Sequence, residues 1–97
     1  MFSITVNDDK KVFVAGRLDA SQTDQAAAVL DKLSATTEVN FKDLEYISSA
    51  GLGILLKTQK RLSASGNKLI LTNMNKLFRD IFPIARFDLI FQIEPKQ

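Results

Sequence analysis

Two short segments near the start of the chain alternate hydrophobic and polar residues, which is the pattern of half-buried β-strands. They run from Ser3 to Val6 and from Lys11 to Ala15, and the polar stretch Asn7 to Lys10 between them has the composition of a turn. Together these segments predict a β-hairpin. The stretch Gly16 to Ala20 is predicted to break the second strand.

The first helix is predicted to begin at Ser21. Ser21 and Asp24 have the spacing of a capping box, with Asp in place of the usual Glu or Gln. The apolar positions that follow at helical spacing form one buried stripe: Ala26, Val29, Leu30 and Leu33.

Two further helices are bounded by residues that start or stop helices. One runs from about Ala50 to Ala64 and ends at Gly66. The other runs from Asn75, its predicted N-cap, to Phe82, with Pro83 as its stop. The phenylalanines in and after this last helix are predicted to be core residues rather than a ligand-binding set: Phe78, Phe82, Phe87 and Phe91.

Apolar runs between and after the helices predict three more strands. They run from Thr37 to Phe41, from Lys68 to Thr72 and from Leu89 to Ile93. The predicted order is therefore β-β-α-β-α-β-α-β, in which strands alternate with helices as in parallel sheets with crossover connections. We expect an α/β fold: a small, mixed, mostly parallel sheet with helices packed on one side. Residues 1–97 are expected to form a single domain.

Composition excludes several kinds of chemistry. The chain has 97 residues and contains neither cysteine nor histidine. Disulfides, thiolate zinc sites, cysteine nucleophiles, imidazole ligands and a Ser-His-Asp triad are therefore excluded. One tyrosine and no tryptophan make a poor stacking platform for single-stranded nucleic acid. We expect no enzyme activity, no cofactor and no metal site.

The charges are scattered along the chain, and the formal net charge is only +2. So small an excess predicts no nucleic-acid partner. No apolar run approaches the ~18 residues of a membrane span. The first residues lack the basic and apolar regions of a signal peptide. We therefore expect a cytoplasmic protein without membrane insertion.

The segment from Tyr46 to Leu56 has an unusual composition for the start of a helix, because it contains two serines and two glycines. Ser49 is predicted to be the N-cap, accepting a hydrogen bond from the N–H of Gly51 or Leu52. A glycine inside a helix costs about 1 kcal/mol relative to alanine. Gly51 and Gly53 leave the backbone uncovered, which suggests that another group comes close there.

The helix that follows is predicted to have a core stripe and an outer face. The core stripe comprises Leu52, Leu55, Leu56, Gln59 and Leu62. The outer face carries Ile54 with Lys57, Thr58 and Arg61, so that an exposed Ile54 beside Gly53 could begin an interaction patch. The plainer interpretation is also open, because single exposed apolar residues on a solvated basic face are common.

The segment from Ile47 to Gly53, preceded by Gly16 to Asp19, resembles the STAS domain and, more closely, the bacterial anti-sigma factor antagonists. The resemblance covers the chain from about Lys11 to Phe91. It implies a small mixed sheet flanked by helices, and a phosphoacceptor serine just before a small residue and Gly-Leu. By position that serine is Ser49. Ser48 stands where relatives usually carry Asp, which makes it a rival phosphoacceptor.

The resemblance also implies a partner surface around this serine. Asp19 matches the acidic residue of the family's first long loop, and Asn40 matches a strand-end position that is Asp or Asn in relatives. The residues assigned to partner binding are Asp19, Ser48, Ser49, Ala50, Gly51, Gly53, Ile54 and Lys57. Many relatives carry one more helix at the C-terminal end. That helix is expected to be missing here, leaving sheet surface open or covered by a partner.

The implied function is a phosphorylation-controlled partner switch. An anti-sigma factor with serine kinase activity binds when Ser49 is unmodified and is released when Ser49 is phosphorylated, and a PP2C-type phosphatase resets the switch. A phosphate adds roughly −1.5 to −2 charges. A helix N-terminus tolerates that charge, so the fold should survive modification. The chain itself is expected to be a monomer or a weak dimer.

Three alternatives stay open. Ser49 could be an N-cap and nothing more. The chain could be a constitutive accessory subunit of a lipid-transport ATPase complex or a signalling scaffold, without phosphoregulation. It could also be an enzyme that uses the carboxylates of Asp19 and Asp43, although no motif links them to a base or a metal.

Overall fold

The computed structural model describes residues 1–84 and 86–94. Within these residues the strands form one five-stranded sheet in the order β1-β2-β3-β4-β5. The strands are β1 (Phe2–Val6), β2 (Val12–Leu18), β3 (Thr37–Ile47), β4 (Leu69–Thr72) and β5 (Gln92–Glu94). β1 and β2 are antiparallel, and each later strand is parallel to the one before it. The predicted mixed, mostly parallel sheet is confirmed.

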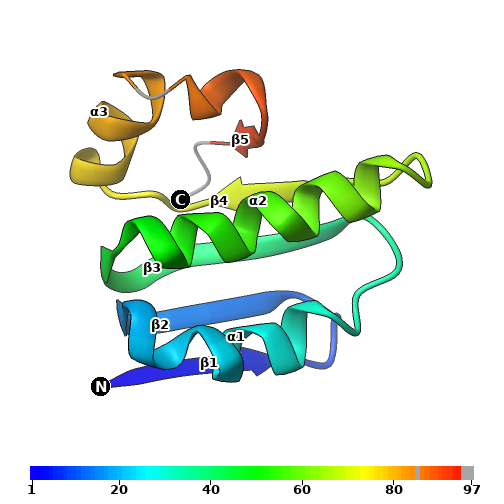
Figure 1. Ribbon diagram of the computed structural model, residues 1–97, viewed down its shortest axis with the longest axis horizontal. Coiled ribbons are helices and arrows are strands. Elements are labelled where there is room, and N and C mark those ends of the chain that lie inside the picture. The colour runs from blue at the N-terminus through cyan, green and yellow to red at the C-terminus, as the bar shows by residue number, and fades with distance from the viewer. Residues whose placement is uncertain (85, 95–97) are drawn as a thin grey trace.

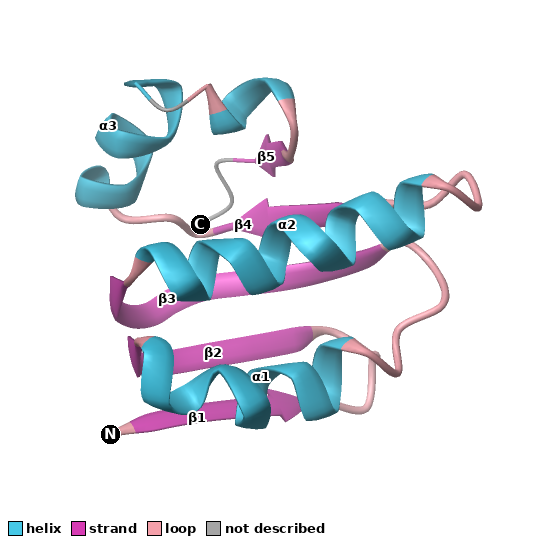
Figure 2. Ribbon diagram, in the orientation of Figure 1, coloured by secondary structure: helices cyan, strands magenta, loops and turns pink. Residues whose placement is uncertain are grey.

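The helices lie in the connections between the parallel strands, as predicted. They are α1 (Thr23–Leu30), α2 (Ser49–Ser63) and α3 (Lys76–Ile84), with short 3₁₀ helices at Ala20–Gln22 and Phe87–Leu89. α1 and α2 lie side by side over one face of the sheet, α1 over the hairpin and α2 over β3 and β4 (Figures 1 and 2). This arrangement places the first turns of α1 and α2 at the carboxyl ends of β2 and β3.

The hydrophobic core lies between the sheet and these helices. Its buried strand and helix residues include Val12, Val14, Leu18, Ala26, Leu30, Val39, Phe41, Leu44, Leu55, Leu62, Leu69 and Leu71. The predicted stripe of the first helix is confirmed in part, because Ala26 and Leu30 are buried while Val29 and Leu33 are half-buried. Strand residues with period two and helix residues with period 3.6 thus point at the same layer.

The phenylalanines near the C-terminus belong to the core, as predicted. Phe78, Phe82 and Phe91 are buried, and Phe87 packs against the core. Phe82 lies 5.4 Å from Phe87 between ring centroids and 6.1 Å from Phe91. The first contact is edge-on and the second is tilted, and ring pairs at these distances are typical of aromatic cores.

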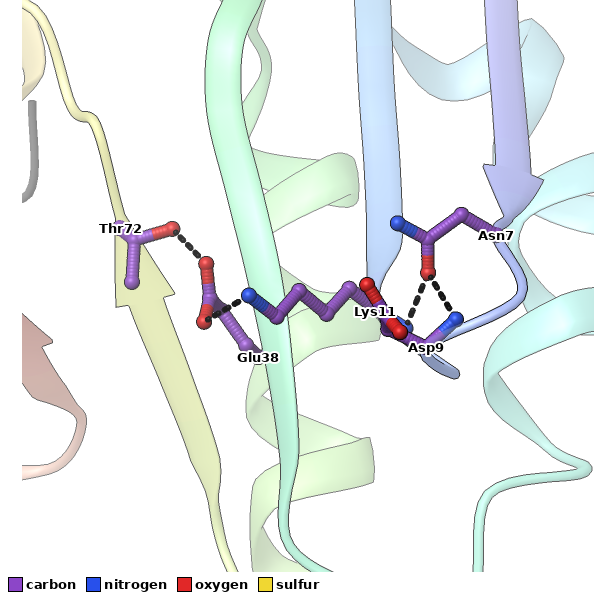
Figure 3. Close-up of polar contacts among 5 residues, drawn as sticks. All are labelled: Asn7, Asp9, Lys11, Glu38 and Thr72. Atoms are coloured by element: carbon purple, nitrogen blue, oxygen red, sulfur yellow. Dashed lines mark hydrogen bonds and ion pairs between the residues drawn. The ribbon is translucent and has the colours of Figure 1, made fainter.

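The other face of the sheet carries polar side chains. In Figure 3 the strands stand in front of the helices, and Lys11, Glu38 and Thr72 project from the near face. Lys11 Nζ lies 3.7 Å from a Glu38 carboxylate oxygen, and the Thr72 hydroxyl donates a hydrogen bond of 2.9 Å to the other oxygen. These contacts link Lys11, the residue before β2, to β3 and β4 on the face that α1 and α2 leave open.

Gly16 does not break β2, so the predicted end of that strand was wrong. β2 continues to Leu18, and Gly16 adopts a positive φ of 84° within it. A Cβ at this position would lie 2.1 Å from the carbonyl oxygen of Met1. The glycine therefore allows close approach to the N-terminal strand while pairing continues.

β3 is also longer than predicted and runs six residues past Phe41 to Ile47. Asn40 therefore does not end the strand. Its side-chain oxygen accepts a hydrogen bond of 2.8 Å from the N–H of Lys42, where the register with β2 shifts by one residue. Such a bulge interrupts the alternation of side chains. The exposed residues after Phe41 therefore lack the alternating sequence pattern that predicts a strand.

Two predictions near the C-terminus need correction. Asn75 caps α3 as predicted, because its side-chain oxygen accepts a hydrogen bond of 3.2 Å from the N–H of Phe78. Pro83 lies inside the last turn of α3, which ends at Ile84, and so is not its stop. The final strand begins at Gln92 instead of Leu89, because Phe87–Leu89 forms a 3₁₀ helix.

Candidate functional site

The predicted site residues lie where the carboxyl ends of β2 and β3 meet the first turn of α2. Leu18 and Ile47 are paired at the ends of these strands. The N–H of Ser48 donates a hydrogen bond of 2.9 Å to the carbonyl oxygen of Leu18. Asp19 directly follows Leu18, so the fold brings the Asp19 loop and the serine segment to the same edge of the sheet.

Ser48, and not Ser49, is the N-cap of α2. Ser48 has extended backbone angles (φ −87°, ψ 172°), and its hydroxyl accepts a hydrogen bond of 3.1 Å from the N–H of Gly51. Its carbonyl oxygen accepts another of 2.9 Å from the N–H of Leu52. The prediction that Ser49 caps the helix was wrong by one residue. The N–H, the hydroxyl oxygen and the carbonyl oxygen of Ser48 each take part in a hydrogen bond within the chain.

Ser49 occupies the first helical position and is exposed. Its hydroxyl makes no hydrogen bond to any residue in 1–84 or 86–94. The first N–H groups of a helix have no partner within the helix. Here the groups of Gly51 and Leu52 are taken by Ser48, which leaves those of Ser49 and Ala50. An exposed hydroxyl thus lies at the positive end of a 15-residue helix.

The two glycines of this turn differ in their surroundings. A Cβ on Gly51 would lie 2.9 Å from the Leu18 carbonyl oxygen and from side-chain carbons of Leu18 and Ile47. A Cβ on Gly53 would meet nothing within 4 Å. Gly51 is buried and lets α2 approach the strand ends. It is therefore not part of the exposed surface that a partner could contact. Gly53 leaves an exposed stretch of helix backbone, as predicted.

Asp19 is the N-cap of the 3₁₀ helix Ala20–Gln22 that precedes α1. Its carboxylate accepts hydrogen bonds from the N–H (3.0 Å) and the hydroxyl (2.7 Å) of Ser21. The N–H of Asp19 in turn donates to the side chain of Gln22 at 3.2 Å. The capping box is therefore Asp19 with Gln22, and the predicted pair Ser21 and Asp24 was wrong. The hydrogen bonds from Ser21, helped by nearby Arg17, lower the pKa of Asp19, which keeps it ionised.

The outer face predicted for α2 is only partly correct. Ile54 is half-buried against the core, so it is not the exposed apolar residue that we expected. Thr58 is 2% exposed and its hydroxyl donates to the Ile54 carbonyl oxygen at 2.9 Å. Arg61 donates to the carbonyl oxygens of Leu33 (2.7 Å) and Leu30 (2.9 Å) and so caps the end of α1. Lys57 remains exposed, as predicted.

Of the residues assigned to partner binding, Ser49, Ala50, Gly53 and Lys57 are exposed, while Asp19, Ser48 and Ile54 are half-buried. The sequence analysis missed a neighbouring pair. Arg17 lies over the ring of Tyr46, 4.3 Å from its centroid, and Tyr46 is 38% exposed. Both residues sit just before the loops that carry Asp19 and Ser48. The sequence carried no signal for this pair, because Arg17 and Tyr46 lie beyond the predicted ends of the two strands and are brought together only by the pairing of β2 with β3.

No group of three His, Cys, Asp or Glu side chains in the described residues could hold a metal ion. No helix in the same part of the chain is long and apolar enough to cross a membrane.

Comparison with known proteins points to one family. A family model described as "Mlab, STAS domain" matches residues 4–92. A putative anti-sigma factor antagonist, BtrV of Bordetella bronchiseptica, is 33% identical over 69 residues, which is 71% of this chain but only 60% of that protein. The anti-sigma-B factor antagonist of Bacillus subtilis is 28% identical over 92 residues, covering 92% of this chain and 84% of that protein.

Solved structures of the anti-sigma factor antagonist SpoIIAA share the fold. The unphosphorylated form matches with a TM-score of 0.73 at 21% identity, covering all of this chain and 90% of that one. The phosphorylated form matches with a TM-score of 0.70 at the same identity, covering 99% and 93%.

Proposed function

This chain belongs to the STAS domain family, and from that membership we propose that it is an anti-sigma factor antagonist whose partner binding is controlled by phosphorylation of Ser49. Two relatives with this kind of name support the first half of the proposal. The second half rests mainly on one observation: the exposed Ser49 hydroxyl stands free at the start of α2.

Ser49 suits a kinase better than its rival Ser48. A kinase must place the acceptor oxygen in line with the γ-phosphorus of ATP, which requires an accessible hydroxyl. The Ser48 hydroxyl is half-buried and accepts the hydrogen bond from Gly51. Phosphorylating Ser48 would disturb the helix cap, whereas Ser49 can be phosphorylated without losing a side-chain hydrogen bond to any of the residues that the structure describes.

The partner is an anti-sigma factor with serine kinase activity, which supplies ATP and Mg²⁺. It contacts the exposed flank of α2 formed by Ser49, Ala50, Gly53 and Lys57. The small residues leave room for a flat surface to approach the helix backbone. Asp19 borders this flank and keeps its negative charge because its pKa is lowered.

The reaction at Ser49 is phosphoryl transfer. The Ser49 oxygen attacks the γ-phosphorus of ATP, the bond to the β-phosphate oxygen breaks, and ADP leaves. The hydroxyl proton passes to a base of the kinase. A PP2C-type phosphatase reverses the modification with water as the attacking group, releasing inorganic phosphate and restoring the hydroxyl.

The phosphate changes the interface more than the fold. It brings roughly −1.5 to −2 charges and three acceptor oxygens. The unpaired N–H groups of Ser49 and Ala50 and the helix dipole offset this charge within the chain. A partner packed against the same flank would have to bury the new charge. A loss of ~3 kcal/mol in binding free energy lowers affinity more than about a hundredfold.

The proposal is tested by affinity capture from the source cells with four immobilised baits: wild type, Ser49→Ala, Ser49→Asp and Ser34→Asp. Ser34→Asp is the matched control, because Ser34 is an exposed serine in the loop after α1. We expect an anti-sigma factor of the serine-kinase type on every bait except Ser49→Asp. If Ser49→Asp captures the same partner in wild-type amounts, the phosphorylation switch is wrong and a constitutive subunit is favoured.

A further inference from the structure

We propose that the free edge of β1, together with the flank of α1 above it, binds a second copy of this chain in a two-fold symmetric dimer. The interface joins the two sheets edge to edge through antiparallel pairing of β1 with β1. This inference is independent of the proposed function, because it concerns the β1 edge of the sheet and not the first turn of α2 (Figure 1).

The backbone groups of β1 alternate between β2 and solvent. The N–H of Arg17 donates to the Met1 carbonyl oxygen at 2.9 Å, and the N–H of Asn7 donates to the Lys11 carbonyl oxygen at 3.0 Å. In β1 the odd-numbered residues therefore direct their backbone N–H and C=O groups toward β2, and the even-numbered residues direct theirs away from the sheet. Of these outward groups in the described structure, only the carbonyl oxygen of Phe2 has a partner, the side-chain amide of Gln25 at 3.4 Å.

This edge lacks the usual protection against pairing. Exposed sheet edges are commonly blunted by charges, proline, bulges or short strands. β1 is five residues long, has the uncharged sequence FSITV and pairs with β2 without a register shift. The opposite edge strand, β5, has three residues and carries Glu94. The contrast marks β1 as the edge suited to bind another strand.

The strand is complementary to itself. Antiparallel pairing centred on Ile4 sets Ile4 opposite Ile4 of the second copy and Phe2 opposite Val6. This register lets every outward-facing residue of the strand pair, because Phe2, Ile4 and Val6 all direct backbone groups to that side. Val6, which is 50% exposed, gains an apolar neighbour on the helix-bearing face. On the open face Ser3 meets Thr5, a favourable cross-strand pair.

The helix above the strand has a matching symmetry. Gln25 contacts Phe2, while Lys32, just past the end of α1, lines a hollow together with Val6. α1 therefore runs alongside β1 in the same direction (Figure 1). Because Ala28 is midway between these two contacts in the helix sequence, we place this exposed residue near the level of Ile4. A two-fold axis through this level brings Ala28 against its copy, with only small side chains at the closest approach.

Charge complementarity supports the same axis. Asp24 lies one turn before Ala28, and Lys32 lies one turn after it. Both side chains are exposed. Antiparallel packing of the two α1 helices places Asp24 of each copy toward Lys32 of the other, so the flank that meets its copy carries no like-charge pair at these positions. Opposite charges arranged in this way fix the register of an interface.

Cysteine scanning tests the register, because the chain has no cysteine of its own. In Ile4→Cys the two new thiols face each other across a hydrogen-bonded pair, whose Cα atoms are about 5.5 Å apart. That separation suits a disulfide. Thr5→Cys is the matched control, since its copies are displaced along the strands. We expect at least tenfold more disulfide-linked dimer for Ile4→Cys under mild oxidation. Equal yields, or more from Thr5→Cys, would overturn the register.

Sedimentation equilibrium of the wild type, from about 10 µM to about 1 mM, tests the dimer itself over the range expected of small interfaces. We expect the mass to rise toward twice that of the chain. Ala28→Arg should keep the monomer mass at all these concentrations, whereas Ala64→Arg, an exposed alanine at the end of α2, should behave as wild type. Circular dichroism checks that each variant is folded. A wild type that remains monomeric throughout, or an Ala28→Arg variant that still dimerises, would contradict the proposal.

Discussion

The two flanks of the first turn of α2 differ in their surroundings, although their residues alternate within six positions of the chain, from Ser48 to Gly53. On the inner flank, Ser48 and Gly51 are held by the chain itself through hydrogen bonds and close packing against Leu18. On the outer flank, Ser49 is exposed and Gly53 has open space around it. One motif therefore contains a set of residues that builds the helix start and a set that remains exposed, on which we propose that the partner binds.

The difference indicates how the proposed binding surface is held on a rigid support. The cap and the glycine contact fix the direction of α2 relative to β2 and β3. The outer residues are held in place by this support, although their own side chains make no hydrogen bonds to it within the described structure. Changes on the inner flank should therefore lower stability, and changes on the outer flank should alter binding while leaving the fold intact.

The largest expected effect is on binding, at the outer serine. Ser49→Asp should lower affinity for the captured anti-sigma factor by more than about a hundredfold, because a negative charge would have to be buried at the contact. Its free energy of unfolding should change by less than about 0.5 kcal/mol, as is usual for exposed positions. Titration calorimetry and urea unfolding measure the two quantities. Tight binding by this variant would remove the functional contrast between the flanks.

The next largest effect is on stability, at the inner glycine. Gly51→Ala should lower the free energy of unfolding by about 1–3 kcal/mol, because its Cβ would press on the Leu18 carbonyl oxygen and two side chains. Urea unfolding measures the loss, and partner binding by the folded fraction should remain. A loss below about 0.5 kcal/mol would show that the strand ends can move to accommodate a methyl group. Close packing would then not explain why a glycine is found at position 51.

Removing the cap should have a smaller effect. Ser48→Ala takes away the acceptor for the Gly51 N–H. N-cap replacements by alanine typically cost ~1 kcal/mol. The same urea experiment applies, with Ser49→Ala as the matched control that loses no hydrogen bond within the described structure. Equal losses for both variants would contradict the assignment of the cap to Ser48.

Gly53→Ala should act in the opposite direction to Gly51→Ala. Its new methyl group meets nothing within 4 Å, and alanine favours the helix over glycine by up to about 1 kcal/mol. We expect a higher melting temperature in a thermal unfolding scan. Weaker binding of the anti-sigma factor by this more stable variant would place the partner directly over Gly53. A destabilised variant would mean that the outer flank is more crowded than the structure shows.

The smallest effect concerns acid pH. The pKa of Asp19 is lowered from 3.8 by the hydrogen bonds from Ser21, so its ionised form is favoured in the folded state. This contribution to stability is fully present above the unfolded-state pKa of 3.8 and is lost as the pH falls through the lower folded-state pKa. Asp19→Asn should therefore show a weaker pH dependence of unfolding below pH 4 than wild type. Parallel curves for the two proteins would contradict the role of Asp19 as a charged cap.

Local pattern predicted the order of the elements because most strands and helices bury one face and carry ordinary end signals. Asn75 is an example, since its capping hydrogen bond lies within four residues. The length of β3 could not be predicted in the same way. Lys42, Asp43 and Glu45 are exposed, and what keeps them in a strand is the pairing with β2, which is distant in sequence.

The site was predicted in outline and missed in detail for similar reasons. Two adjacent serines offer equally good caps, and only the bond from Ser48 to Leu18 decides between them. Ile54 was expected to be exposed because a helical wheel does not show the neighbouring elements that half-bury it. Arg61 was predicted to be a solvated side chain, yet it donates hydrogen bonds to the carbonyl oxygens at the end of α1.

The central claim is that Ser49, and not Ser48, receives the phosphate. The most direct measurement is phosphosite mapping by tandem mass spectrometry after the captured anti-sigma factor and ATP are incubated with wild type, Ser48→Ala and Ser49→Ala. The account predicts phosphate on Ser49 in wild type and in Ser48→Ala, and none in Ser49→Ala. Phosphate on Ser48 in wild type, or full modification of Ser49→Ala, would contradict it.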